Sequence, residues 1–372
     1  DGFFFGAAYT SADVVDGGAG TLDQIGLQGD YSSGVTLGTL TGVELVVLLR
    51  GSDTRFGAPG TQVYDYNITA TDSSVAAGQN LILQANTLQV GEDFTFNGSA
   101  EMDGTFTVYG GFGVDTFTGG SGSAGDGFFF GQDRFGASDV INGGGSTMDQ
   151  VGFQGNFSVT FGAAQLSNVE FIVLLSAVDT RFGADGGTAG YQLTMHQGNV
   201  AAGQQMIISA NSLKAGETLT FNGSAETDGS FRIFSGASSD SISGSQNADE
   251  IYGGGGPDGL RGNGGADQFV YIDVTHSSFA TGRDWIEDFT PGSDKLNLTA
   301  IDANQSAFSS GNQAFTFIGS QAFSEVAGQL RVVNAGTYWE VQGDVNGDGV
   351  ADFAIDVVVA TGQPITAADI LL

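Results

Sequence analysis

Three consecutive blocks decide the fold: Gly244-Ser-Gln-Asn-Ala-Asp249, Gly253-Gly-Gly-Gly-Pro-Asp258 and Gly262-Asn-Gly-Gly-Ala-Asp267. With Asp240 before them, an Asp recurs every nine residues. An apolar residue follows two positions after each Asp, at Ile242, Ile251, Leu260 and Phe269. A glycine-rich turn that alternates with one inward-pointing apolar residue predicts a stack of very short strands.

The residue types of this repeat predict a metal site. Glycines allow backbone angles at which the carbonyl oxygens of the turn converge on one point. Ca²⁺ takes about six to eight oxygen ligands from carboxylates and carbonyls. Two nonapeptides complete one coil, so we expect Asp240 and Asp258 to line one edge and Asp249 and Asp267 the other. The alternative is a Gly/Asp-rich linker that binds no metal.

A longer repeat precedes the nonapeptides. Asp1-Gly-Phe-Phe-Phe-Gly6 recurs as Asp126-Gly-Phe-Phe-Phe-Gly131, and Phe96-Asn-Gly-Ser-Ala-Glu101 recurs as Phe221-Asn-Gly-Ser-Ala-Glu226, at an offset of 125. The first copy begins at a repeat boundary, so we expect the chain to be a piece of a longer protein. Glu101 and Glu226 hold equivalent positions, which favours a structural role, because a catalytic group is rarely duplicated intact.

Short β-branched or aromatic segments alternate with Gly, Asn and Asp throughout both copies. The strands that we expect from them are 81–83, 94–96, 106–108, 206–208, 219–221 and 231–233. Nothing of helical period and length separates them, which argues against a sheet with crossover helices. The sequence predicts an all-β fold, a parallel β-roll or β-solenoid built from tandem repeats with a C-terminal β cap. Its expected parts are 1–125, 126–234, 235–282 and 283–372.

Degenerate copies of the nonapeptide occur upstream. Asp115 completes a full repeat with Phe117, whereas Asp23 and Asp149 follow turns with one inserted residue. Three further candidate ligands also lie two residues before an apolar residue: Asp13, Asp126 and Asp139. At all of these positions a metal ligand and an Asp that bonds only to the backbone of its turn remain open alternatives.

Composition excludes several partners and chemistries. The chain has 42 acidic and 10 basic residues, a net charge of −32, which disfavours nucleic acid and anionic membranes. It has no cysteine and no apolar run that approaches a transmembrane helix. The two histidines, His196 and His276, form no His-Glu-x-x-His motif, and Gly254-x-Gly256-x-x-Gly259 lies inside the nonapeptides with no helix after it. We expect no enzyme, although the many carboxylate pairs leave glycoside hydrolysis open.

Residues 235–270 resemble the repeats-in-toxin (RTX) β-roll, and residues 283–372 resemble the C-terminal region of serralysin-type metalloproteases. The matching stretches are Asp284-Trp-Ile-Glu-Asp-Phe-Thr-Pro-Gly-Ser-Asp-Lys-Leu-Asn-Leu298, Phe315-Thr-Phe-Ile-Gly319 and Gly343-Asp-Val-Asn-Gly-Asp-Gly-Val-Ala-Asp-Phe353. In the last stretch, Asp344, Asn346, Asp348 and Asp352 have the spacing of an EF-hand-like calcium loop, but Ile355 stands where its final Glu is expected. An Asp/Asn/Gly turn without metal is the alternative.

The resemblance implies a secreted protein that is exported by a type I apparatus, through an uncleaved C-terminal signal that Asp369-Ile-Leu-Leu372 resembles. It also implies several bound calcium ions and an extracellular or cell-surface location. Two roles compete. One is a surface-layer, filament or adhesin component with self-association or a cell-surface partner. The other is the secretion and folding appendage of a hydrolase whose catalytic domain lies upstream.

Overall fold

The computed structural model describes residues 1–57, 60–181, 187–280, 282–305 and 311–372. The chain forms two compact units. Unit 1 comprises Asp1–Gly187 with Gly198–Ala201, and unit 2 comprises Thr188–Gln197 with Ala202–Leu372. Both are built from short strands, and the helical structure in the described residues is the 3₁₀ turn η1 (Ala367–Asp369). The predicted all-β class is confirmed. Within the described ranges no helix is long and apolar enough to cross a membrane.

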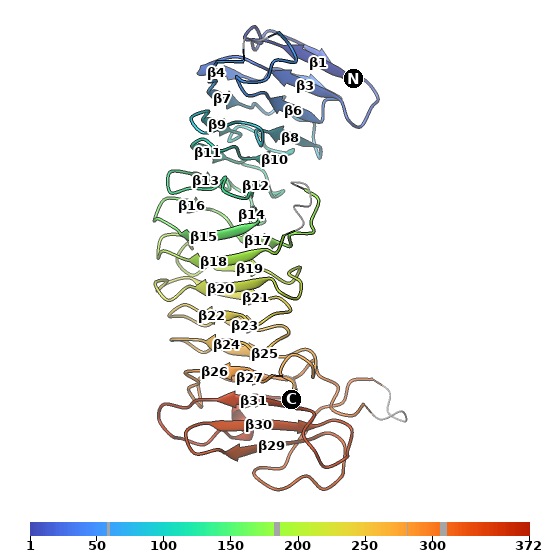
Figure 1. The fold of residues 1–372 in the computed structure, drawn as a ribbon, viewed down its shortest axis with the longest axis vertical. Helices are drawn as coiled ribbons and strands as arrows, with labels where there is room; N and C mark the ends of the chain where they lie inside the picture. The colour runs from blue at the N-terminus through green and yellow to red at the C-terminus, as the bar shows by residue number, and fades with distance from the viewer. Residues whose placement is uncertain (58–59, 182–186, 281, 306–310) are drawn as a thin grey trace. The chain divides into compact units, whose positions relative to one another are not determined.

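Unit 1 is a stack of coils, each of which contributes strands to parallel sheets (Figure 1). The first sheet contains, in spatial order, β1 (Gly2–Phe5), β3 (Gln24–Leu27), β6 (Leu45–Leu48), β8 (Asn80–Gln84), β10 (Thr105–Tyr109), β12 (Gly127–Gly131), β14 (Gln150–Gln154) and β17 (Phe171–Leu175). The second contains β4 (Tyr31–Thr36), β7 (Tyr66–Thr69), β9 (Phe94–Asn97), β11 (Asp115–Thr118), β13 (Val140–Asn142) and β16 (Leu166–Ser167). The remaining strands of this unit are the pair β2 (Val15–Asp16) and β5 (Leu40–Thr41), and β15 (Asn156–Thr160).

Unit 2 has the same construction from short strands. One sheet contains β19 (Gln205–Ser209), β21 (Ser230–Phe234), β23 (Glu250–Tyr252), β25 (Gln268–Val270), β27 (Lys295–Asn297) and β32 (Ile370–Leu371). The other contains β18 (Gly190–Thr194), β20 (Thr218–Asn222), β22 (Ser241–Ser243), β24 (Gly259–Arg261), β26 (Trp285–Ile286), β31 (Phe353–Val357), β30 (Trp339–Asp344), β29 (Gln329–Asn334) and β28 (Thr316–Phe317). The pairs β29/β30 and β30/β31 are antiparallel, so the coil pattern gives way there to a meander.

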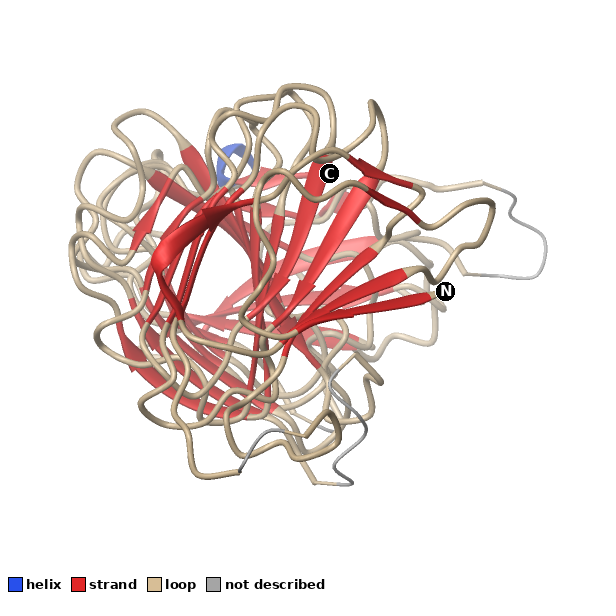
Figure 2. Cartoon of the chain, turned by 90° about the horizontal axis from the view of Figure 1, so that it is seen from above, coloured by secondary structure: helices blue, strands red, loops and turns tan. Residues whose placement is uncertain are grey.

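The strands form where the expected segments lie because each places alternate side chains in the core. In β10, Phe106 and Val108 are buried, and the residues beside them are half exposed. The three-residue strands β22, β23 and β24 bury only their central residue, which is the apolar one two positions after Asp, and β25 buries Phe269 and also Val270. Figure 2 shows the strands in red, with the turns and loops that connect them at the periphery. The Asp residues of the nonapeptides therefore end the turns, directly before each strand, and the strands provide the core.

Candidate metal sites

The Asp residues of the nonapeptides form two carboxylate ladders in unit 2. On one edge, the Asp240 amide donates to Asp258 Oδ1 at 2.8 Å, and the Asp258 amide donates to Asp284 Oδ1 at 3.0 Å. On the other edge, the Asp249 amide donates to Asp267 Oδ1 at 2.9 Å, which lies one coil further along. This is the two-edge arrangement that the nine-residue spacing predicts. One carboxylate oxygen is thereby fixed, and the second points into the turn.

The first glycine of each nonapeptide leaves room for that second oxygen. A Cβ at Gly253 would lie 2.8 Å from Asp258 Oδ2 and 3.4 Å from Asp284 Oδ2, so both oxygens face the same space. A Cβ at Gly244 would collide with Asp249 Oδ2 and lie 3.0 Å from the carbonyl oxygen of Gly262. Carboxylate and carbonyl oxygens of successive coils therefore converge where the repeat requires glycine. At Asp240 this position is Ser235, whose hydroxyl donates to Asp240 Oδ2.

Burial makes these carboxylates costly to ionise. It raises the pKa of Asp258 to about 9, with a further contribution from the charge of Asp284, and the pKa of Asp267 to about 8. The pKa of Asp284 rises to about 7 and that of Asp249 to about 6 for the same reason. A buried carboxylate without a counter-charge holds a proton instead. At neutral pH these positions therefore favour either a proton or a bound cation.

The Asp258–Asp284 edge fits Ca²⁺. Both carboxylates are at most 2% exposed, and among the described residues no donor meets hydrogen-bond geometry with Asp258 Oδ2 or Asp284 Oδ2, although the buried Tyr271 hydroxyl lies near Asp284 and lowers its pKa against the effect of burial. Unpaired buried oxygens are rare, and a divalent ion between two coils would satisfy both. Asp240, Asp249 and Asp267 complete the two edges, although Asp249 Oδ2 already accepts the Ser245 amide at 2.6 Å.

Unit 1 repeats the ladder with longer coils. The Asp115 amide donates to Asp139 Oδ1 at 2.8 Å, and the Asp126 amide donates to Asp149 Oδ1 at 2.7 Å. All four residues are buried, and burial raises the pKa of Asp115 to about 8 and that of Asp149 to about 7. Asp115 Oδ1 and Asp149 Oδ2 lack hydrogen-bond partners, whereas Asp115 Oδ2 accepts the Gly111 amide at 3.0 Å. The Asp115 carboxylate thus accepts one hydrogen bond from its own turn and keeps one oxygen without a partner among the described residues.

The two remaining candidates of unit 1 differ from each other. Asp23 is buried, its amide donates to Glu44 Oε2 at 2.9 Å, and its Oδ2 has no partner within the described residues. Asp13 is half-buried, and its Oδ2 accepts the Thr10 amide at 2.7 Å and the Thr10 hydroxyl at 3.0 Å. Among the bonds of the described residues, none links Asp13 to another predicted ligand. Asp23 therefore belongs to a ladder and Asp13 caps a local turn.

The EF-hand-like stretch forms the hairpin loop between β30 and β31. Asp344 is buried, and its two oxygens accept the amides of Gly347 at 2.6 Å and Gly349 at 3.0 Å. Asp352 accepts the Val345 amide at 2.7 Å. The exposed side chains of Asn346 and Asp348 accept the amides two residues ahead of them, at 2.8 Å each. The loop is a set of Asx turns whose oxygens could exchange these bonds for a metal.

The ladders contain acids that the nine-residue period misses. Asp284 and Asp294 extend the two edges of unit 2, 26 and 27 residues beyond the preceding Asp. Glu44 and Glu170 take the Asp position in unit 1, and Glu170 Oε2 accepts the Asp149 amide at 3.0 Å. Each of these four residues lies two positions before a buried apolar residue. An acidic residue two positions before an apolar one is therefore a simpler signal, and it identifies these four acids where longer loops interrupt the nine-residue period.

Comparison with known families agrees with this geometry. Residues 194–372 match the family model described as Peptidase M10 serralysin C terminal, which confirms the serralysin-like resemblance for this part of the chain. The match supports a non-catalytic, calcium-binding RTX-type region of a secreted protein. No curated protein matches the chain.

Proposed function

We propose that the chain is the extracellular, calcium-dependent module of a type I-secreted RTX protein, and that it serves as a surface-layer, filament or adhesin component. The observation that carries the proposal is the pair of unpartnered oxygens, Asp258 Oδ2 and Asp284 Oδ2, that face one glycine-lined space. The predicted ligands of unit 2 are Asp240, Asp249, Asp258, Asp267, Asp344, Asn346, Asp348 and Asp352. Those of unit 1 are Asp13, Asp23, Asp115, Asp126, Asp139 and Asp149.

Calcium would supply charge neutralisation between coils. Without it, buried like charges on successive rungs oppose each other, so the folded state is disfavoured at neutral pH. In a cytosol with little calcium, the chain would stay unfolded and pass through the secretion channel. Outside the cell, calcium at about millimolar concentration would fill sites of the weak extracellular class. The free energy of calcium binding then stabilises the folded chain.

Calorimetry of the full chain in about 1 mM calcium and in chelator tests this proposal. We expect a higher melting temperature in calcium, together with calcium uptake by equilibrium dialysis. Magnesium at the same concentration serves as the control, because Mg²⁺ demands a tighter octahedral shell. An equal melting temperature in calcium and chelator, with no uptake, contradicts the proposal.

The serralysin C-terminal match favours a second candidate, a secretion and folding appendage of an upstream hydrolase. Tandem 125-residue copies instead suit a component that stacks with others. Electron microscopy of the purified chain with calcium distinguishes the two. Ordered sheets or filaments support the structural role, and dispersed particles at the same concentration support the appendage.

A further inference from the structure

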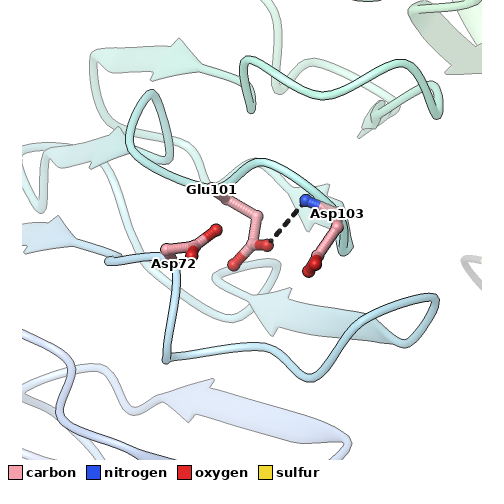
Figure 3. Close-up of side chains that lie close together, drawn as sticks. All are labelled: Asp72, Glu101 and Asp103. Carbon is pink, nitrogen blue, oxygen red and sulfur yellow. Dashed lines mark hydrogen bonds between the residues drawn. The ribbon is translucent and has the colours of Figure 1, made fainter.

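Three acidic residues in unit 1 meet outside the nonapeptide register. One carboxylate oxygen from each of Asp72, Glu101 and Asp103 lies within 4.8 Å of the others (Figure 3). Asp72 comes from the loop between β7 and β8, and the other two come from the loop between β9 and β10. The cluster therefore joins the loops of successive coils at one corner of the stack.

Glu101 is the buried centre of this cluster. Its side chain is 0% exposed, and Figure 3 shows its carboxyl group between Asp72 and Asp103. Oε1 accepts the amides of Asp103 at 3.2 Å and Gly104 at 2.8 Å. Oε2 has no hydrogen-bond partner among the described residues. A buried carboxylate oxygen without a donor destabilises the folded chain, so its presence points to a ligand.

Burial alone does not leave a glutamate oxygen without a hydrogen-bond donor. Glu92, in the same unit, is also buried at 2% exposure. Its Oε1 accepts the Gly51 amide at 2.6 Å, and its Oε2 accepts the Gln89 amide at 2.7 Å. Both oxygens of Glu92 are therefore satisfied by the chain itself, whereas half of the Glu101 carboxylate is not.

The cluster also lacks a positive charge. None of the ion pairs formed by the described residues includes Asp72, Glu101 or Asp103. Carboxylates within 4.8 Å of one another repel when they are charged. A cation between them converts this repulsion into attraction.

We propose that Asp72, Glu101 and Asp103 bind a hard divalent cation, with Ca²⁺ as the best fit. Glu101 Oε2 would provide the buried ligand, and the exposed carboxylates of Asp72 and Asp103 would close the shell together with water. The ion would tie two successive coils of unit 1 beside the turn that precedes Asp126, where the Ser121 amide donates to the carbonyl oxygen of Glu101 at 2.7 Å. The proposal does not depend on calcium binding by the nonapeptides.

The second copy of the repeat provides an internal comparison. Glu226 is likewise 0% exposed, its Oε1 accepts the Asp228 amide at 3.0 Å, and its Oε2 also lacks a partner in the described structure. The residue 125 positions after Asp72 is Gln197, however, so this copy has a neutral amide in place of the third carboxylate. We expect it to bind the cation at least about tenfold more weakly, because affinity rises with the charge of the ligand set.

Two variants of the full chain test the site by counting bound Ca²⁺ in equilibrium dialysis at about 1 mM calcium. D72N removes one charge but keeps an oxygen that can accept the Met102 amide, which donates to Asp72 Oδ1 at 3.1 Å. We expect D72N to bind one ion fewer than the unmodified chain. Q197D supplies the missing carboxylate to the second copy, and we expect it to bind one ion more.

The outcomes are separable. An unchanged ion count in D72N overturns the proposal. If circular dichroism shows that D72N does not fold, Q197D decides: an added ion supports the site, and an unchanged count overturns it. If the nonapeptides bind no calcium, the unmodified chain still binds the ion that D72N loses, so failure of the proposed function is distinct from failure of this inference.

Discussion

The nonapeptide segment of unit 2 and the degenerate repeats of unit 1 form the same ladder from different sequences. In unit 2, the amide of Asp240 meets the carboxylate of Asp258, 18 residues further on. In unit 1, the corresponding step from Asp115 to Asp139 takes 24 residues. The hydrogen bond is 2.8 Å long in both. Ladder geometry therefore depends on the register of parallel strands, and loops absorb the difference in length.

The two regions differ in how their free oxygens are placed. Asp258 and Asp284 direct two unpartnered oxygens to one glycine-lined space, whereas Asp115 and Asp149 leave one free oxygen each on separate ladders. The pair of free oxygens lies where a 26-residue coil follows the nonapeptides, whereas the second oxygens of Asp240 and Asp249 accept bonds from Ser235 and Ser245. We expect calcium to stabilise the nonapeptide segment more than the unit 1 ladders.

The largest expected effect is a pH dependence whose sign reverses with calcium. The raised pKa values of Asp258, about 9, and Asp115, about 8, mean that the folded chain binds more protons than the unfolded chain above about pH 4. Without calcium, the free energy of unfolding should fall as pH rises to about 9. The slope is about 1.4 kcal/mol per pH unit for each such group. With calcium, protons compete with the ion, so stability should fall towards acid pH.

Circular dichroism between about pH 5 and about pH 8, on chain depleted of calcium with a chelating resin, measures the folded fraction, and urea denaturation measures the free energy of unfolding at each pH where the chain is folded. Hydrogen exchange of backbone amides compares the ladder edges of the two units. The unit 1 edge at Asp149, with a pKa of about 7, should loosen at lower pH than the edge at Asp258. A calcium-free chain that is more stable at the upper pH contradicts the predicted sign.

Asp258→Asn should lower stability by about 3 kcal/mol in calcium. In chelator at neutral pH it should raise stability, because asparagine needs no proton to stay neutral at this buried position. The asparagine keeps an oxygen for the Asp240 amide but loses the charge that Ca²⁺ requires. Asp149→Asn, at the degenerate ladder, is the matched comparison and should show a smaller calcium-dependent loss. Chemical denaturation of both variants with and without calcium measures the difference. Equal losses in calcium and chelator for Asp258→Asn would refute a metal role for that carboxylate.

Gly253→Ala should reduce stability by about 2 kcal/mol in calcium, since its Cβ would occupy the space that Asp258 Oδ2 and Asp284 Oδ2 face. Gly255→Ala is the control, because a Cβ there would lie 3.7 Å from the nearest atom, Ala237 Cα, which is an ordinary contact. Thermal unfolding and calcium uptake should change for the first variant only. A similar loss at both positions would show that glycine acts there through backbone freedom alone.

Local patterns predict much of this molecule, and loop lengths explain the remainder. The expected strand at 106–108 falls within β10, because the alternation of buried and half-exposed side chains follows from the residue types of neighbouring positions. The pairing of Asp240 with Asp258 follows from a coil of constant length. The nine-residue period does not predict Asp284, because the loop before it lengthens the coil to 26 residues. The contact of Asp72 with Glu101 joins two loops of different coils, and no period in the sequence encodes it.

The smallest expected effect concerns Asp13, the predicted ligand that lies outside every ladder. Its carboxylate is half-buried and accepts only the amide and hydroxyl of Thr10 among the bonds that the structure describes. Asp13→Asn keeps an acceptor oxygen for the amide, so stability should fall by less than about 1 kcal/mol. The loss should be the same in calcium and in chelator, measured by urea denaturation beside Asp149→Asn. A calcium-dependent loss of stability at Asp13 would indicate a metal site outside the ladders. It would contradict the link between strand register and calcium binding on which the comparison of the two regions depends.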